Sequence, residues 1–316
     1  MTALRREHRL NGLEPDNLLA FLALLGLIRA LGTARPAWRP RVRWSVDEPP
    51  VRPVLVAPAG ADEVATAAAE GVAALAAHHV FDRRDLAFSQ SEARAALGRA
   101  AQAGGEAAQL WSALASDAAL ARDGERIEPT PLCLLFGQGH QHFLERLAGV
   151  PALAAPERAE GRRRVIVTPE ACIAEALFGP WTRPDPTPSF RWDPHEDVRY
   201  ALRATDPTDA KTKETTQHGA NRLAAIGLAE FTVVPESRGG RPRLTMRGMV
   251  RGPDGAPAVR WPIWRAPVSL AGLRALLAHP RLDEPAVRAA LGIAEMRRAR
   301  RISVGKFMNF TRAEAE

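Results

Sequence analysis

All but three of the 43 basic residues in this 316-residue chain are arginines, and one group of them is spaced as on a strand. In an extended segment, Arg243, Arg247 and Arg251 would share one face, about 13 Å apart at a rise of about 3.3 Å per residue. Such a row could follow a phosphate backbone. Residues 237–265 contain seven arginines and a single acid, Asp254. With so few local acids to pair with, a nucleic-acid contact is favoured over a solvated sheet face.

A second basic cluster lies near the C-terminus. Its cations are Arg297, Arg298, Arg300, Arg301 and Lys306. The stretch SVGKF around Lys306 lacks the first glycine and the final hydroxyl residue of an ATP-binding phosphate loop, which argues against an NTPase. The segment is predicted to carry Lys306 to a phosphate or to an acidic protein surface. A purely structural terminus is the alternative.

Two of the three lysines, Lys211 and Lys213, fall in the polar stretch TDPTDAKTKETTQHGANR (205–222). A stretch of Thr, Asp, Lys and Gln cannot form a core, so a surface loop is predicted. A helix is expected to start near residue 220 or 221, where free N–H groups beside Asn221 and Arg222 would attract an anion. Lysine suits such a loop because its compact charge tolerates many geometries. The alternative is an ordinary exposed loop.

Two short patterns could instead support metal-dependent nuclease chemistry, and neither is complete. Asp209 and Lys211 have the acid-x-Lys spacing of such nucleases but lie among Pro, Thr and Asp residues rather than on a strand. The stretch HHVFDRRD resembles a metal-binding cluster without matching ligands elsewhere; its candidates are His78, His79, Asp82 and Asp85. A pair of histidines two residues apart, His140 and His142, is poorly placed to share a metal from one helix face. No catalytic residue, metal or cofactor is predicted.

Several tryptophans lie in or near the basic region: Trp181, Trp192, Trp261 and Trp264. Aromatic rings beside arginines can stack on exposed bases. Tryptophan is more often a largely buried core residue, and that interpretation is favoured here.

The elements that must position these residues indicate a mixed α/β or α+β fold. The apolar run LLAFLALLGLI (18–28) is predicted to be a buried helix that begins near Asp16 or Asn17. Short strands are expected at 41–46 and 52–57, helices at 61–78 and within 91–121, and a hairpin from 243–252 and 258–266. Closely spaced prolines between 179 and 207 suggest a boundary between a helix-rich domain (1–180) and a basic domain (181–316).

The net charge differs between the two halves of the chain. Residues 1–160 hold 17 Arg and 19 Asp+Glu, a net of −2, and residues 161–316 hold 26 Arg+Lys and 17 Asp+Glu, a net of +9. This asymmetry indicates a polyanionic partner. The cysteines Cys133 and Cys172 lie in apolar surroundings, which fits a reducing cytoplasm. The longest apolar run is shorter than the roughly 20 residues of a membrane span, so no membrane partner is predicted.

Three stretches together resemble proteins encoded beside type I CRISPR loci, especially those of the I-G (formerly I-U) group. The stretches are LNGLEPDNLLAFLALLGLIRAL (10–31), FRWDPHEDVRYALRATDPTDAKTKETTQHGANRLAAIGL (190–228) and RRISVGKFMNFT (300–311). None of them is a catalytic signature. Such proteins build RNA-guided surveillance complexes for antiviral defence, in which base pairing reads the sequence and protein reads shape and backbone.

The resemblance implies a large-subunit-like component of such a complex, or an accessory to its helicase-nuclease. At 316 residues the chain is short for a large subunit, which leaves the accessory role open. The expected partners are guide RNA or target DNA, other complex subunits and the helicase-nuclease. The sequence thus predicts a non-enzymatic, cytoplasmic nucleic-acid-binding subunit. The alternatives are a metal-dependent nuclease and a protein-interaction adaptor with an incidental basic surface.

Overall fold

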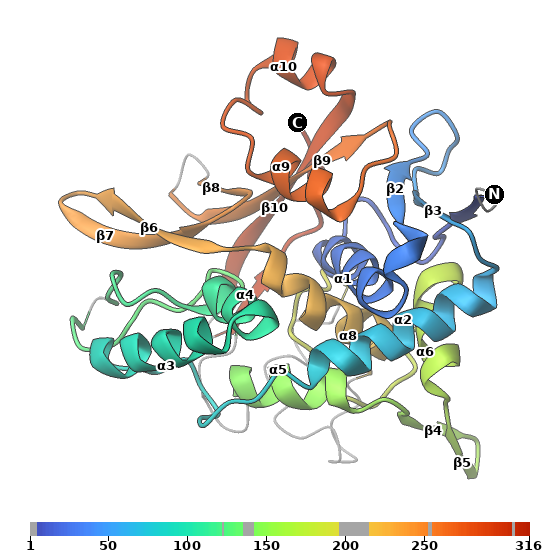
Figure 1. The fold of residues 1–316 in the computed structure, drawn as a ribbon, viewed down its shortest axis with the longest axis horizontal. Helices are drawn as coiled ribbons and strands as arrows, with labels where there is room; N and C mark the ends of the chain where they lie inside the picture. The colour runs from blue at the N-terminus through green and yellow to red at the C-terminus, as the bar shows by residue number, and fades with distance from the viewer. Residues whose placement is uncertain (1–4, 122, 135–141, 196–214, 252–254, 305–306) are drawn as a thin grey trace.

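A computed structural model describes residues 5–121, 123–134, 142–195, 215–251, 255–304 and 307–316 (Figure 1). Helices combine in it with several small antiparallel sheets, which confirms the mixed α+β class. Among these residues, none of the helices has both the length and the apolar character needed to cross a membrane.

The described helices are α1 (Leu18–Ala34), α2 (Ala61–Ala76), α3 (Gln90–Ala103), α4 (Gly105–Leu114), α5 (Phe143–Ala152), α6 (Pro169–Phe178), α8 (His218–Gly227), α9 (Leu270–Leu277) and α10 (Pro285–Ala290), with short 3-10 turns η1 (Pro36–Trp38) and η2 (Leu228–Glu230). Helices α1, α2 and α8 lie together in the body of the molecule, whereas α3 lies at the lower left and α10 at the top of Figure 1.

Among the described residues, the strands form four separate antiparallel groups. They are β1 (Arg6–Arg9), β2 (Arg41–Trp44), β3 (Pro53–Ala57), β4 (Glu157–Glu160), β5 (Arg163–Ile166), β6 (Val233–Arg238), β7 (Arg241–Met246), β8 (Met249–Arg251), β9 (Pro257–Trp264), β10 (Ile293–Val304), β11 (Phe307–Phe310) and β12 (Glu314–Ala315). Strand order is β1-β3-β2 in one sheet and β11-β10-β9-β8 in the largest, where β12 also pairs with β10. The pairs β4-β5 and β6-β7 are two-stranded.

Helix α1 is the centre of the fold, as its uniformly apolar sequence predicts. Every residue from Leu18 to Leu31 is buried. The side-chain oxygen of Asn17 accepts a hydrogen bond from the Ala20 N–H at 3.3 Å and so caps the first turn, which confirms the predicted start. Both α2 and α8 pack directly against this helix. A helix that is apolar on all sides requires neighbours on all sides, and the fold supplies them.

Glycines allow these helices to approach each other backbone to backbone. A Cβ atom placed on Gly26 would lie within 3.0 Å of the Leu223 carbonyl oxygen in α8, and one on Gly227 would meet the Leu22 carbonyl in α1 in the same way. Gly71 of α2 lies equally close to the Ala30 carbonyl of α1. The three helices therefore fit together only where the side chain is a single hydrogen atom.

The largest sheet packs onto the same core through its aromatic residues. Trp261 on β9 stacks on Phe21 of α1 with ring centroids 5.1 Å apart. Trp264, also on β9, meets Trp44 of β2 edge to face at 5.9 Å. Residues from both sides of the boundary expected at residue 180 thus contribute to one hydrophobic cluster, which extends from Leu10 to Ala313.

One buried ion cluster ties α1 to three later elements. The guanidinium Nε of Arg29 lies 2.9 Å from a carboxylate oxygen of Glu230, and the same arginine pairs with Glu106 on α4. Glu230 also accepts a 2.6 Å bond from Arg274 of α9. Burial lowers the pKa of Arg29, whereas the hydrogen bond to Glu230 raises the pKa of Arg274. Because Arg29 is compensated by two carboxylates, the charge is tolerated inside the core.

Replacing Gly26 by alanine should lower the free energy of unfolding by about 1–3 kcal/mol or more, because the added methyl must push α8 away from α1. Gly32 is a matched control in the same helix, since a Cβ atom there would meet nothing within 4 Å. The variant Gly32→Ala should be neutral or stabilising by up to about 1 kcal/mol. Urea denaturation of both variants measures the difference, and equal effects would contradict the close approach.

Candidate functional site

Three of the arginines singled out in the sequence line one pocket, although they lie on three different strands. Arg243 is on β7, Arg251 on β8 and Arg301 on β10, and they border a cavity of about 430 Å³. Glu128 and the apolar side chains of Leu244, Met249 and Met308 also line it, together with prolines. We call this cavity the basic pocket. It combines several cations with an apolar wall.

One carboxylate and two carbonyl groups hold the arginines of the basic pocket in place. Arg243 pairs with Glu128 at 3.1 Å. Glu128 also accepts the Leu244 backbone N–H at 2.8 Å and thereby covers the outer edge of β7. Arg251 donates to the Gly255 carbonyl at 3.1 Å, and Arg301 to the Pro131 carbonyl at 3.2 Å. The side chains are therefore oriented before any ligand arrives.

Burial and like charge both act on Arg301. Burial is the main cause that lowers the pKa of its guanidinium; among the nearby groups, Arg251 lowers this pKa, whereas Cys133 and Glu128 raise it. Arginine remains protonated under such conditions because its ordinary pKa lies far above neutral pH. An anion bound in the basic pocket would relieve the repulsion between these two cations.

The predicted row of arginines on a single strand is wrong. Strand β7 ends at Met246 and β8 begins at Met249, in another sheet. Arg247 lies in the turn between them, and Gly248 adopts a left-handed φ of 70° there. Local alternation of side chains did not reveal this break. The part of the predicted hairpin that the structure confirms is the antiparallel pairing of β8 with β9.

The predicted shortage of acidic partners near this segment is also wrong, because carboxylates distant in sequence supply them. Arg265 pairs with Asp47 at 2.7 Å and Arg260 pairs with Asp283. Beyond the segment, Arg312 pairs with Asp16 at 2.6 Å. Much of the positive charge of the second half is thus neutralised within the fold.

The C-terminal arginines are largely paired as well. On β10, Arg297 donates to Glu295 at 2.7 Å and Arg298 lies 2.9 Å from Glu316. Arg300 lies 3.8 Å from Glu314 on β12. The basic C-terminal segment forms an antiparallel pair of strands, β10 and β11. Among these four arginines, Arg301 is the one that faces the basic pocket.

The predicted anion contact by Asn221 and Arg222 is not supported by their position. Helix α8 begins at His218, earlier than expected, and both residues are fully buried. Arg222 donates to the carbonyl oxygens of Pro151 and Ala154, each at 3.3 Å, at the C-terminal end of α5. The negative end of that helix compensates the buried charge. Lys211, Lys213 and Lys306 lie outside the described residues.

The metal-binding patterns are dispersed in the fold. Asp82 pairs with Arg99 at 2.8 Å, and the His142 Nδ1 lies 2.8 Å from Asp85. The ring of His79 is buried and bonds to the Leu147 carbonyl at 2.8 Å. Within the described part of the chain, no three metal-ligating side chains come together. Asp209 and His140 lie outside that part.

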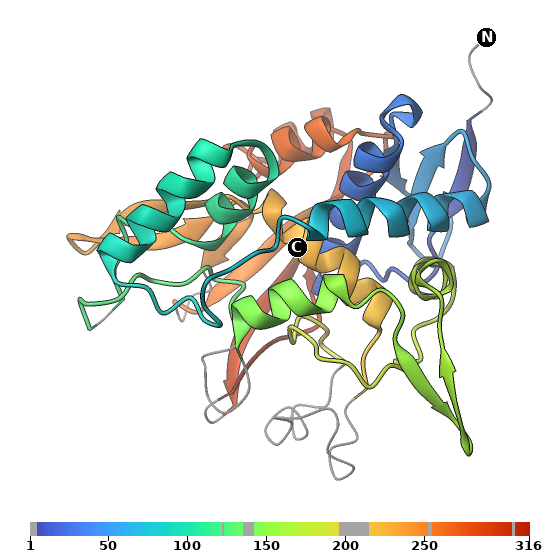
Figure 2. The same ribbon diagram turned by 60° about the horizontal axis from the view of Figure 1, so that its bottom comes forward.

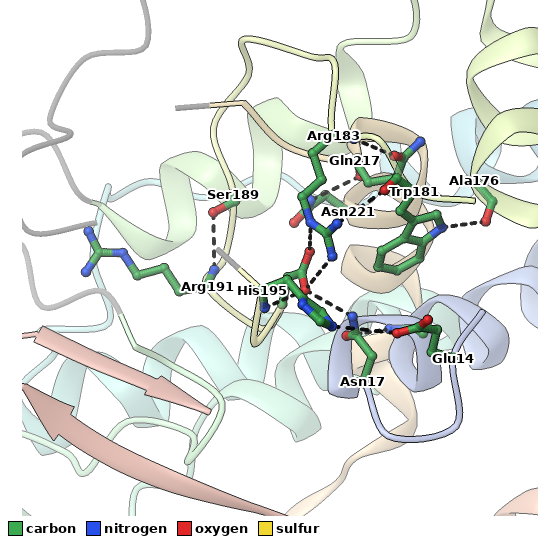
Figure 3. A network of polar contacts seen from close by, with 12 residues as sticks. Glu14, Asn17, Ala176, Trp181, Arg183, Ser189, Arg191, His195, Gln217 and Asn221 are labelled. Carbon is green, nitrogen blue, oxygen red and sulfur yellow. Dashed lines mark hydrogen bonds and ion pairs between the residues drawn. The ribbon is translucent and has the colours of Figure 1, made fainter. Parts of the chain in front are cut away.

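The FRWDP segment begins the central stretch that carries the resemblance, and its residues contribute to a buried polar network (Figure 3). The Asp193 carboxylate accepts hydrogen bonds from Asn17 at 3.0 Å and from Arg183 at 2.7 Å. The side chain of Gln217, just before α8, accepts the Arg183 backbone N–H at 3.2 Å. This network fastens residues 181–195 to the start of α1 and to the start of α8.

The tryptophans belong mainly to the core, as the sequence favoured. Trp192 stacks on Phe190 with centroids 4.4 Å apart, and its indole N–H donates to the Leu132 carbonyl at 2.9 Å. Trp261 and Trp264 are also fully buried. Trp181 is half-buried and donates to the Ala176 carbonyl. The three fully buried tryptophans present no ring face to a base, and the Arg183 guanidinium lies 5.9 Å from the ring centre of Trp181.

A group of exposed arginines that was not predicted from the sequence lies on the hairpin β4-β5, which projects from the body of the molecule (Figures 1 and 2). Arg162, Arg163 and Arg164 occupy its tip and are exposed. Arg164 pairs with Glu157 at 3.2 Å. The base of the hairpin is anchored by Arg158, which bonds to Asp185 at 2.6 Å and to Glu175 at 2.7 Å. The three consecutive arginines at 162–164 are the sequence feature that could have predicted this exposed basic group.

No family model, curated protein or solved structure matches this chain.

Removing the carboxylate of Asp193 should destabilise the protein by about 3–5 kcal/mol, because Arg183 and Asn17 would lose their buried acceptor. The control is Asp47→Ala, which breaks an exposed pair with Arg265 and should cost less than about 1 kcal/mol. Chemical denaturation of Asp193→Ala and Asp47→Ala compares the two. A small effect at Asp193 would show that the network does not hold the fold.

Two buried histidines should make the protein less stable in mild acid. Burial lowers the pKa of both His79 and His218 from 6.5 to about 4. The unfolded chain takes up these protons near pH 6.5 and the folded chain does not, so the free energy of unfolding falls between pH 6.5 and about 4. Each histidine contributes up to about 2 kcal/mol of this loss between pH 7 and 5.

Urea unfolding at pH 7 and pH 5 measures this loss. The variant His218→Asn should be less stable than the wild type at pH 7 and should show a smaller loss at pH 5. His279→Asn, which changes a histidine outside the core, should retain the wild-type loss. An unchanged pH dependence in His218→Asn would contradict the assignment of a neutral buried ring.

Proposed function

We propose that this chain is a non-enzymatic nucleic-acid-binding subunit of a type I CRISPR surveillance complex and that it contacts DNA or RNA through the basic pocket. The observation that carries the proposal is the convergence of Arg243, Arg251 and Arg301 on one cavity. The resemblance of three sequence stretches supports the CRISPR assignment. Neither a cofactor nor a metal is required for this role.

Forked guanidinium groups suit phosphate because each can donate two parallel hydrogen bonds. The carbonyl and carboxylate partners of the three arginines hold them in position, which reduces the entropy lost on binding. Binding of a phosphate chain also releases its counterions, which adds favourable free energy at low salt. The exposed tip of β4-β5, with Arg162 and Arg163, offers a further cationic contact.

A protein-interaction adaptor is the second candidate, and a specific observation favours it. Arg297, Arg298 and Arg300 pair with carboxylates of the same half of the chain, so they are not free to attract a polyanion. An adaptor would show no affinity for nucleic acid when isolated, yet would copurify with its neighbours after nuclease treatment.

The double variant Arg243→Gln/Arg251→Gln should bind a 20-nucleotide single strand at least ten-fold more weakly in 0.1 M salt. Each lost phosphate contact should also reduce the slope of log affinity against log salt by about 0.7. Fluorescence anisotropy across a salt series measures both quantities.

The matched control is Arg41→Gln/Arg281→Gln, which removes the same charge at two exposed positions outside the pocket. This variant should retain most of the affinity. An equal loss in both double variants would show that net charge, rather than the basic pocket, determines binding. Copurification of the wild-type chain with guide RNA and neighbouring CRISPR subunits tests the assignment to the complex.

A further inference from the structure

The three arginines of the basic pocket line one cavity instead of following one another along a single strand. A backbone that runs across a protein meets cations one after another along its length. Here Arg243, Arg251 and Arg301 reach a single cavity from three strands of two sheets. Several forked donors around one cavity suit a single phosphate group with several free oxygens.

The charge of the lining residues matches a doubly charged group. Three arginines and Glu128 give the lining a formal net charge of +2. Glu128 is already engaged by Arg243 at 3.1 Å, whereas Arg301 forms no ion pair among the described residues. A phosphate attached through one oxygen carries about −1.5 to −2 at pH 7. A phosphate inside a strand carries a single charge and has two oxygens tied up in esters.

The cavity is larger than a phosphate group, and part of its lining is apolar. The cavity of about 430 Å³ falls within the range of roughly 300–1,000 Å³ that is typical of small-molecule sites. Met249 and Met308 line it, and flexible thioether side chains adapt well to flat rings. The last nucleotide of a strand has one base face without a stacking neighbour, and that face can pack against such a wall.

We propose that the basic pocket binds a nucleoside phosphomonoester, which is either the phosphorylated end of a nucleic-acid strand or a free mononucleotide. The strand end depends on the proposed nucleic-acid function, and the free mononucleotide does not. The phosphate contacts Arg243, Arg251 and Arg301, and the nucleoside lies against the two methionines. The pocket thus recognises an end rather than the interior of a strand.

The test compares four forms of one 12-nucleotide single strand, internally labelled: with a 5′-phosphate, with a 3′-phosphate, with hydroxyls at both ends, and circular. One of the two phosphorylated forms should bind at least ten-fold more tightly than the hydroxyl and circular forms at pH 7.5. This advantage should shrink below about pH 6, where the terminal phosphate loses its second charge. A mononucleotide should compete with the preferred form, and the corresponding nucleoside should not.

Two variants link the result to the pocket. Arg301→Lys keeps the positive charge but loses the two parallel N–H donors of the guanidinium. It should therefore remove most of the higher affinity for the phosphorylated end. Arg251→Gln should do the same where Arg301→Lys folds poorly, and Arg41→Gln should leave the advantage intact. Equal binding of the circular and phosphorylated forms overturns the end-binding proposal and leaves the nucleic-acid function standing.

Direct titration with a mononucleotide separates the remaining outcomes. Mononucleotide binding without any strand binding supports the phosphomonoester site and rejects the nucleic-acid function. Absence of binding to both rejects the two proposals together.

Discussion

The close approach of α1 and α8 is the constraint on which the rest of the structure depends. Gly26 and Gly227 let the two backbones touch, and Gly71 brings α2 onto the same helix. Gly219 at the start of α8 lies just as close to the Cys172 carbonyl of α6. The packing of these helices also determines where the largest sheet lies, because Trp261 on β9 stacks against Phe21 on α1. The two-stranded hairpins β4-β5 and β6-β7 extend outward from this closely packed group of helices.

The packing of distant segments against one another also determines which charged side chains form ion pairs. Cations of the second half that meet acids of the first half, such as Arg265 with Asp47 and Arg312 with Asp16, join segments far apart in the sequence. Arg222 donates to carbonyl oxygens at the C-terminal end of α5, which compensate its buried charge. The net charge of +9 in residues 161–316 therefore describes the composition better than it describes the surface. The basic pocket and the tip of β4-β5 are places where cations still face outward.

Local patterns predicted the local elements well. The cap at Asn17, the strands β2 and β3 and the helix α2 all follow from side chains within a few residues of one another. The errors have a common physical origin in contacts between distant segments. The partner of Arg243 is Glu128, and the burial of Arg222 depends on α5. Three arginines of the candidate pocket were identified, but their convergence required the pairing of strands that sequence spacing does not reveal.

The complete burial of α1 also has a consequence for biosynthesis. Its apolar run is synthesised about 200 residues before α8, the helix that covers it, which is an interval of roughly 10–40 s at about 5–20 residues per second. During that interval the apolar surface of α1 is covered only in part, because α2 packs on one side of the helix and α8 is not yet present. Efficient production of this protein should therefore depend on chaperones that bind emerging hydrophobic segments.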